Sequence, residues 1–190
     1  IIERYKISHT ADEQMTLLLG ASLLLAEKLS RMKPTHPQAS AWEGLTRDVL
    51  DSLFDSQTII ERADFMPDII IKLAGYIPDM AFEYVHKLNA LIPDHPRFLS
   101  ILALVQAMKD DIKAARETIK RAEKLARQQK DTEILETLRS LREELDSPFG
   151  SMIGPMLRMR MSLGDADIDE MDEMMDDFLT FDDDDDEEVF

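Results

Sequence analysis

The chain has 190 residues, which is enough for one helical domain with its own core and an appended segment but too few for two full domains. It contains no cysteine, so disulfides, thiolate metal sites and cysteine nucleophiles are excluded. The formal net charge of -17 disfavours direct binding to nucleic acid or to anionic lipid and favours basic partners.

The N-terminal part of the chain is predicted to be helical. Thr10 and Glu13 have the spacing of a capping box, and a helix is expected from there to about Met32. The apolar run TLLLGASLLLA at 16–26 is shorter than the roughly 18 residues of a membrane span, so we expect a cytoplasmic protein. Because the chain begins with Ile-Ile instead of Met, we expect it to start inside a longer or processed polypeptide.

Three more helices follow in the next 60 residues. Ser40 and Glu43 repeat the capping spacing, and the helix that they open carries apolar residues at helical spacing. These residues are Trp42, Leu45, Val49, Leu53 and Phe54. Pro67 suits the first turn of a short helix ending near Gly75, and another helix is expected over 79–91. No segment alternates as a strand would, so the fold class is all-α.

Residues 99–125 resemble a tetratricopeptide (TPR) repeat, which is a pair of antiparallel helices. The matching positions are Leu99, Leu102 and Ala103 in the first helix, the turn at Asp110 and Asp111, and Ala115, Ile119 and Ala122 in the second. Ala81, Val85 and Pro93 fit a preceding, degenerate repeat, which departs from the pattern at Leu88. The same region has a weaker likeness to the TPR chaperones of type III secretion translocators.

The resemblance implies an α-α superhelix of antiparallel helix pairs, and a non-enzymatic scaffold whose concave face holds a partner peptide. Another helical bundle is the alternative fold. A last helix from Asp131 to about Leu145 would cap the array. The expected organisation is therefore a TPR-like domain over 1–145, a Met-rich linker over 146–163 and an acidic tail over 164–190.

The second helix of the TPR-like repeat carries a stripe of basic residues beside its apolar face. The stripe consists of Lys113, Arg116, Lys120, Lys124 and Arg127. It predicts a docking strip for an acidic ligand, with this protein's own tail as one candidate. The alternative is a solvated helix surface with Glu117 and Glu123 as local partners.

The linker concentrates methionines, whose flexible and polarisable side chains suit adaptable binding surfaces. Met156 and Met159 are the predicted partner-binding residues of this segment, and packing against the end of the helical array is the alternative.

The tail combines acidity with a regular apolar pattern. Fifteen of the 39 Asp and Glu residues lie in 165–190, which has no Lys or Arg, so the preceding residues carry 24 acidic against 22 basic side chains. Spacings of three, four and three residues predict a short amphipathic helix that becomes ordered on binding. Its apolar face consists of Ile168, Met171, Met175 and Phe178.

These patterns predict a protein-binding adaptor or chaperone that is not an enzyme. Its partner is expected to be a protein with a basic or amphipathic segment, and the tail to be a second contact or an autoinhibitory plug. The alternative function is an acidic nucleic-acid mimic that occupies the basic channel of a DNA- or RNA-handling protein. No catalytic residues and no cofactor are predicted. No metal site is predicted either, because the acidic run at 165–176 has Glu170 where a calcium loop needs glycine.

Overall fold

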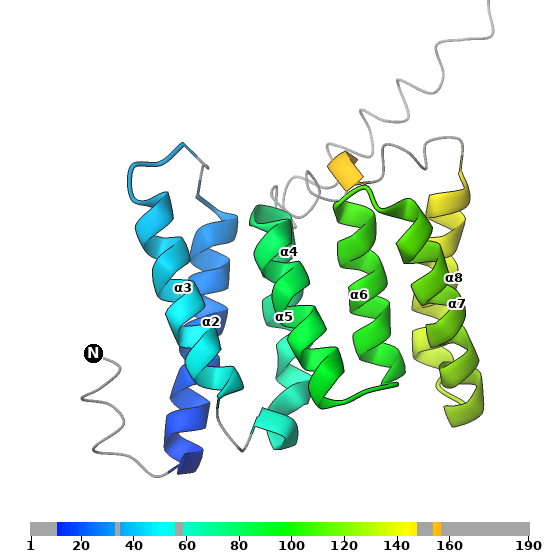
Figure 1. Ribbon diagram of the computed structural model, residues 1–190, viewed down its shortest axis with the longest axis horizontal. Coiled ribbons are helices and arrows are strands. Elements are labelled where there is room, and N and C mark those ends of the chain that lie inside the picture. Colours follow the sequence, from blue (N-terminus) through cyan, green and yellow to red (C-terminus); the bar gives the residue numbers. More distant parts are fainter. Residues whose placement is uncertain (1–10, 33–34, 56–58, 148–153, 157–190) are drawn as a thin grey trace, which may run out of the picture.

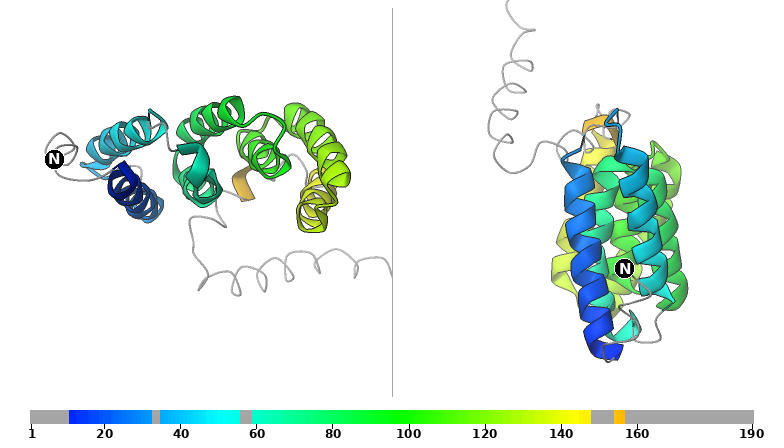
Figure 2. Two further views of the ribbon diagram at one scale, coloured as in Figure 1. Left: turned by 90° about the horizontal axis from the view of Figure 1, so that it is seen from below. Right: turned by 90° about the vertical axis from the view of Figure 1, so that its left-hand side faces the viewer.

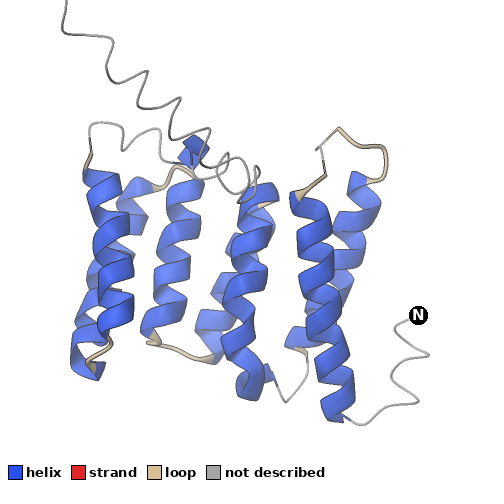
Figure 3. Ribbon diagram, turned by 180° about the vertical axis from the view of Figure 1, so that it is seen from behind, coloured by secondary structure: helices blue, strands red, loops and turns tan. Residues whose placement is uncertain are grey.

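The structure, a computed structural model, describes residues 11–32, 35–55, 59–147 and 154–156. Within these ranges the chain forms helices joined by short turns and has no strand (Figures 1 and 3). The main helices are α2 (Ala11–Ser30), α3 (Ala39–Phe54), the 3-10 helix η1 (Ile59–Phe65), α4 (Met66–Tyr76), α5 (Pro78–Leu91), α6 (Pro96–Met108), α7 (Ile112–Gln129) and α8 (Thr132–Asp146). The all-α prediction is confirmed for this part of the chain.

The helices pack one after another in antiparallel order and form two rows. Along one row, α2 contacts α4, α4 contacts α6, and α6 contacts α8. The helices α3, α5 and α7 lie on the other side, as Figure 2 shows in its left view. Each α-helix except α3 therefore packs against the α-helix that follows it, and the first row is also continuous along the array.

Helix α6 lies at the centre of the larger group of helices and is buried on almost every side. Its side chains Phe98, Leu102 and Val105 belong to one apolar core that extends from α2 to α8. Ala103 on α6 and Ala115 on α7 are completely buried. Small side chains allow two helices to approach closely, so the alanine positions of the predicted repeat do lie at the interface between helices.

Local sequence signals explain where most helices begin and end. Pro67, Pro78 and Pro96 occupy the first turns of α4, α5 and α6, where a missing N–H costs no helical hydrogen bond. The side chain of Asp111 accepts a hydrogen bond from the Ala114 amide, and Asp131 does the same for Ile134. These aspartates cap α7 and α8.

Three details of the region from α3 to η1 differ from the sequence-based expectation. The predicted capping role of Ser40 is wrong, because α3 already begins at Ala39, whose amide donates to the His36 carbonyl. The helix therefore starts one residue before Ser40, so Ser40 lies inside α3 and not at its N-cap. Leu45, predicted on the apolar face, is 42% exposed. The 3-10 helix at 59–65 was not predicted, because it is short and carries no proline or glycine signal.

Candidate functional site

The basic stripe of α7 lies on an exposed side of this helix, but its two arginines are already engaged. Arg116 donates a hydrogen bond of 2.8 Å to the Leu145 carbonyl and forms an ion pair of 2.9 Å with Asp146. Arg127 forms an ion pair of 3.1 Å with Glu123, whose side chain is only 10% exposed. The Arg116 contacts hold α8 against α7, and both ion pairs neutralise part of the stripe.

The three lysines of the stripe remain available. Lys113, Lys120 and Lys124 are exposed, and none forms an ion pair with another described residue. Glu123, one of the two expected local partners, pairs with Arg127 and also with Arg142 of α8 at 2.7 Å. The structure thus divides the five predicted residues into two arginines that form ion pairs and three lysines that face solvent. We call these three lysines the lysine strip.

A short piece of the Met-rich segment packs against the C-terminal end of α6. Residues 154–156 form one helical turn, which Figures 1 and 2 place on the side of α6 that lies between α4 and α8. Gly154 is buried there, and a Cβ atom at this position would lie 2.2 Å from Oδ1 of Asp110 and 2.9 Å from the Ala107 carbonyl oxygen. Only glycine allows so close an approach.

The remaining predicted residues divide into those that the structure places and those that it does not. Met156 is half-buried beside the α6–α7 turn, so its position fits the alternative of packing against the array. The other predicted residues lie outside the described part of the chain, namely Met159, Ile168, Met171, Met175 and Phe178.

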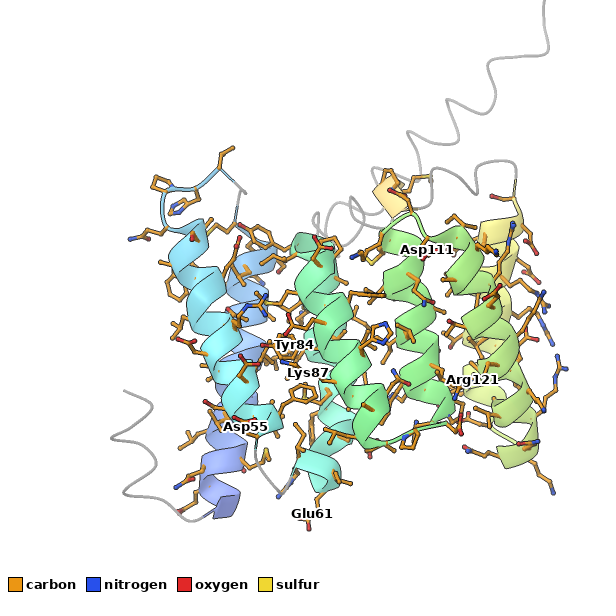
Figure 4. All side chains as sticks on the ribbon, viewed as in Figure 1. Asp55, Glu61, Tyr84, Lys87, Asp111 and Arg121 are labelled. Atoms are coloured by element: carbon orange, nitrogen blue, oxygen red, sulfur yellow. The ribbon has the colours of Figure 1, made fainter. Side chains whose placement is uncertain are left out.

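A polar cluster that the sequence analysis did not identify joins α3 to α5 across the second row of helices. The hydroxyl of Tyr84 donates to Oδ1 of Asp51 at 2.9 Å, and Lys87 donates to the same oxygen at 2.8 Å. Arg47 forms an ion pair of 2.5 Å with Glu83. The ammonium of Lys87 also lies 4.5 Å from the centre of the Tyr84 ring, and Figure 4 shows both residues on the side of α5 toward α3.

The cluster stabilises the charged forms of its acidic and basic side chains and the neutral form of Tyr84. The Lys87 ammonium lowers the pKa of Asp51, and the Arg47 guanidinium lowers the pKa of Glu83. Burial of Tyr84, followed by its hydrogen bond to Asp51, raises the pKa of the phenol above its ordinary value. Because every charge has an opposite partner, the cluster serves to join helices. One sequence signal was present, since Arg47 and Asp51, like Glu83 and Lys87, are four residues apart on one helix.

Exposed apolar side chains occur on α2 and on the 3-10 helix η1. Leu17 and Leu24 on α2 are 49% and 68% exposed, and Ile60 and Phe65 of η1 are each 55% exposed. Gly20, between the two leucines on the same face of α2, has open space where a Cβ would lie. This part of the row could accept apolar side chains of another segment.

Small-molecule features are limited in the described ranges. A hollow of about 440 Å³ lies at the α2–α3 connection and is lined by Lys28, Arg31, Met32, Thr35, His36 and Pro37. It does not coincide with any predicted partner-binding residue. Within 11–32, 35–55, 59–147 and 154–156, acidic and histidine side chains form no group of three that could hold a metal ion. No described helix is both long and apolar enough to cross a membrane.

Comparisons of this chain with protein-family models, curated proteins and solved structures gave no match. The likeness to TPR repeats therefore depends on the residues quoted above and on the order of helix packing.

Proposed function

We propose that the chain is a non-enzymatic scaffold, an adaptor or chaperone, that holds a segment of a protein partner along the row formed by α2, α4, α6 and α8. In this proposal the two rows of helices form a TPR-like superhelix, and the first row lines its concave side. Packing of each helix of this row against the next supports the proposal, because it makes one continuous surface.

The observation that carries the proposal is the position of residues 154–156. A short peptide of this chain lies against α6, and its glycine approaches the α6 backbone at the Ala107 carbonyl. A surface that accepts one short helical segment has the dimensions to accept a partner segment of the same kind. The exposed leucines of α2 and the exposed Phe65 extend this surface with apolar contacts.

The partner segment is expected to be amphipathic. Apolar side chains would cover Leu17, Leu24 and Phe65, which together give this surface its apolar character. The acidic tail would then provide a second contact for basic residues of the partner, or a plug that competes with it.

The proposal can be tested by affinity purification of the full chain and of variants with single charge substitutions. Mass spectrometry then identifies and compares the captured partner. Leu24→Asp and Phe65→Asp should each reduce capture of the same partner. The matched control is Leu45→Asp, because Leu45 is similarly exposed but lies on α3 in the other row. Equal capture by all three variants would contradict the proposal.

Two fragments separate this function from its alternative. Retention of the partner by residues 1–163 would support binding along the helical row. Binding by an isolated 164–190 peptide alone would instead support mimicry of nucleic acid by the acidic residues.

A further inference from the structure

We propose that the lysine strip of α7, Lys113, Lys120 and Lys124, binds the acidic residues 165–177 of the same chain, and that Gly154 holds the tether that brings them there. This inference deepens the proposed function, since it assigns the plug role to a particular surface. The inference rests on the position of Gly154, which is anchored close to the start of α7.

The strip has the charge and the length that such a ligand needs. Helix α7 carries six basic residues and two acidic ones, Glu117 and Glu123. Arg116, Arg121 and Arg127 are held by ion pairs, so the three lysines are the unpaired positive charges of this helix within the described chain. They lie on one side of α7 and extend over about 16 Å at 1.5 Å per residue.

The acidic segment is comparable in length and opposite in charge. Residues 165–177 contain eight Asp and Glu and no basic residue. If they form the predicted helix, they extend over about 18 Å, which is close to the length of the strip. The apolar face of that helix can then pack beside the strip while its carboxylates face the lysines.

The anchor places this segment within reach. Gly154 packs on Ala107 and Asp110, which immediately precede the start of α7. Eight residues lie between Met156 and Asp165, and an extended chain from one to the other reaches about 30 Å. The tether can therefore bring residue 165 to either end of the lysine strip.

The tether also explains how weak contacts could suffice. Exposed ion pairs contribute only about 0–1 kcal/mol each, too little for tight binding between separate molecules. A short tether gives the tail a local concentration in the millimolar range, so modest contacts can keep it bound much of the time. The tail would then occupy α7 without preventing a partner with more basic residues from removing it.

Paramagnetic labelling of the full chain would test this contact. The chain has no cysteine, so Gln128→Cys on α7 gives a single site for a nitroxide label, and Thr16→Cys on α2 gives the distant control. We expect the Gln128 label to remove most of the amide signal intensity of residues 165–181, and the Thr16 label to leave it nearly unchanged.

Charge reversal then identifies the surface. The double variant Lys120→Glu with Lys124→Glu should restore the lost signals. The control, Lys28→Glu with Lys72→Glu, changes the net charge by the same amount at exposed sites and should not restore them. Equal broadening from both labels, no broadening, or no response to the α7 reversal would overturn the inference. Broadening seen only between labelled and isotope-labelled copies in a mixture would also overturn it, in favour of a second copy. Because this experiment needs no partner, its failure would leave the proposed binding row untouched.

Discussion

The hydroxyl of Tyr84 on α5 donates a hydrogen bond of 2.9 Å to the Asp51 carboxylate on α3. The same hydroxyl lies 3.2 Å from the Arg47 carbonyl, and Tyr84 is completely buried. Helices α2 and α3 otherwise meet the following helices chiefly where α2 packs on α4. The Tyr84–Asp51 contact therefore fixes the N-terminal helix pair to the rest of the array from the second row.

Tyr84→Phe should lower the free energy of unfolding by about 1 kcal/mol at neutral pH, because a buried hydrogen bond is lost without a change in packing. The raised pKa of Tyr84 also predicts a pH dependence. The folded state favours the neutral phenol. The contribution of this phenol to the free energy of unfolding is fully present below pH 10, the ordinary phenol pKa, and is lost as pH rises above it. Urea unfolding between about pH 8 and 11 should show a steeper loss in the wild type than in the variant. Parallel curves would contradict the role given to this phenol.

The carboxylates of the same cluster predict how the stability of the fold decreases at acidic pH. Because the pKa values of Asp51 and Glu83 are lowered on folding, their contribution is fully present above the ordinary carboxyl pKa of about 4 and is lost as pH falls below it. The double variant Asp51→Asn with Glu83→Gln should be less stable at pH 7 and less sensitive to acid. Asp48→Asn, an exposed site on α3, is the control and should retain the wild-type profile.

Ala115→Leu should destabilise the protein by about 1–3 kcal/mol, because a fully buried alanine between α6 and α7 leaves no room for a larger side chain. Ala114→Leu on the next, half-buried position is the matched control and should have a smaller effect. Urea unfolding of both variants gives the comparison. If the two substitutions lower the free energy of unfolding equally, close packing at Ala115 does not determine the stability of the α6–α7 pair.

Gly154→Ala should detach residues 154–156 from α6, since the Ala107 carbonyl that a Cβ would meet is backbone and cannot rotate away. We expect faster amide exchange in 154–156 with little loss of global stability. Gly44→Ala is the control, because its Cβ would meet open space in a helix, where alanine is favoured by about 1 kcal/mol. Unchanged exchange at 154–156 would show that the contact is not tight.

Phe178→Ala should release the tail more than reversal of any single lysine of the strip, because apolar burial contributes more than one exposed ion pair. Added salt should loosen the tail only partly, since screening weakens the charge contribution and leaves the apolar one. Amide exchange of residues 165–181 in wild type and variant measures both effects. Equally fast exchange in the two proteins would mean that the apolar residues of the tail serve an external partner.

Much of the helical order was determined by local sequence. Pro67 and Pro96 define first turns, Asp111 and Asp131 cap the helices that follow them, and buried alanines mark where α6 and α7 meet. These features could be predicted because each depends on residues within one or two helical turns of each other.

The tertiary structure decided which charges are used and which remain free. Arg116 and Lys120 have the same pattern in sequence, but only Arg116 reaches the end of α8, some 30 residues later in the chain. The contacts of Tyr84 with Asp51 and of Gly154 with Ala107 likewise join residues more than 30 positions apart. Helical periodicity gives the face of each side chain but not the neighbour that this face meets, because the neighbour depends on how all the helices pack together.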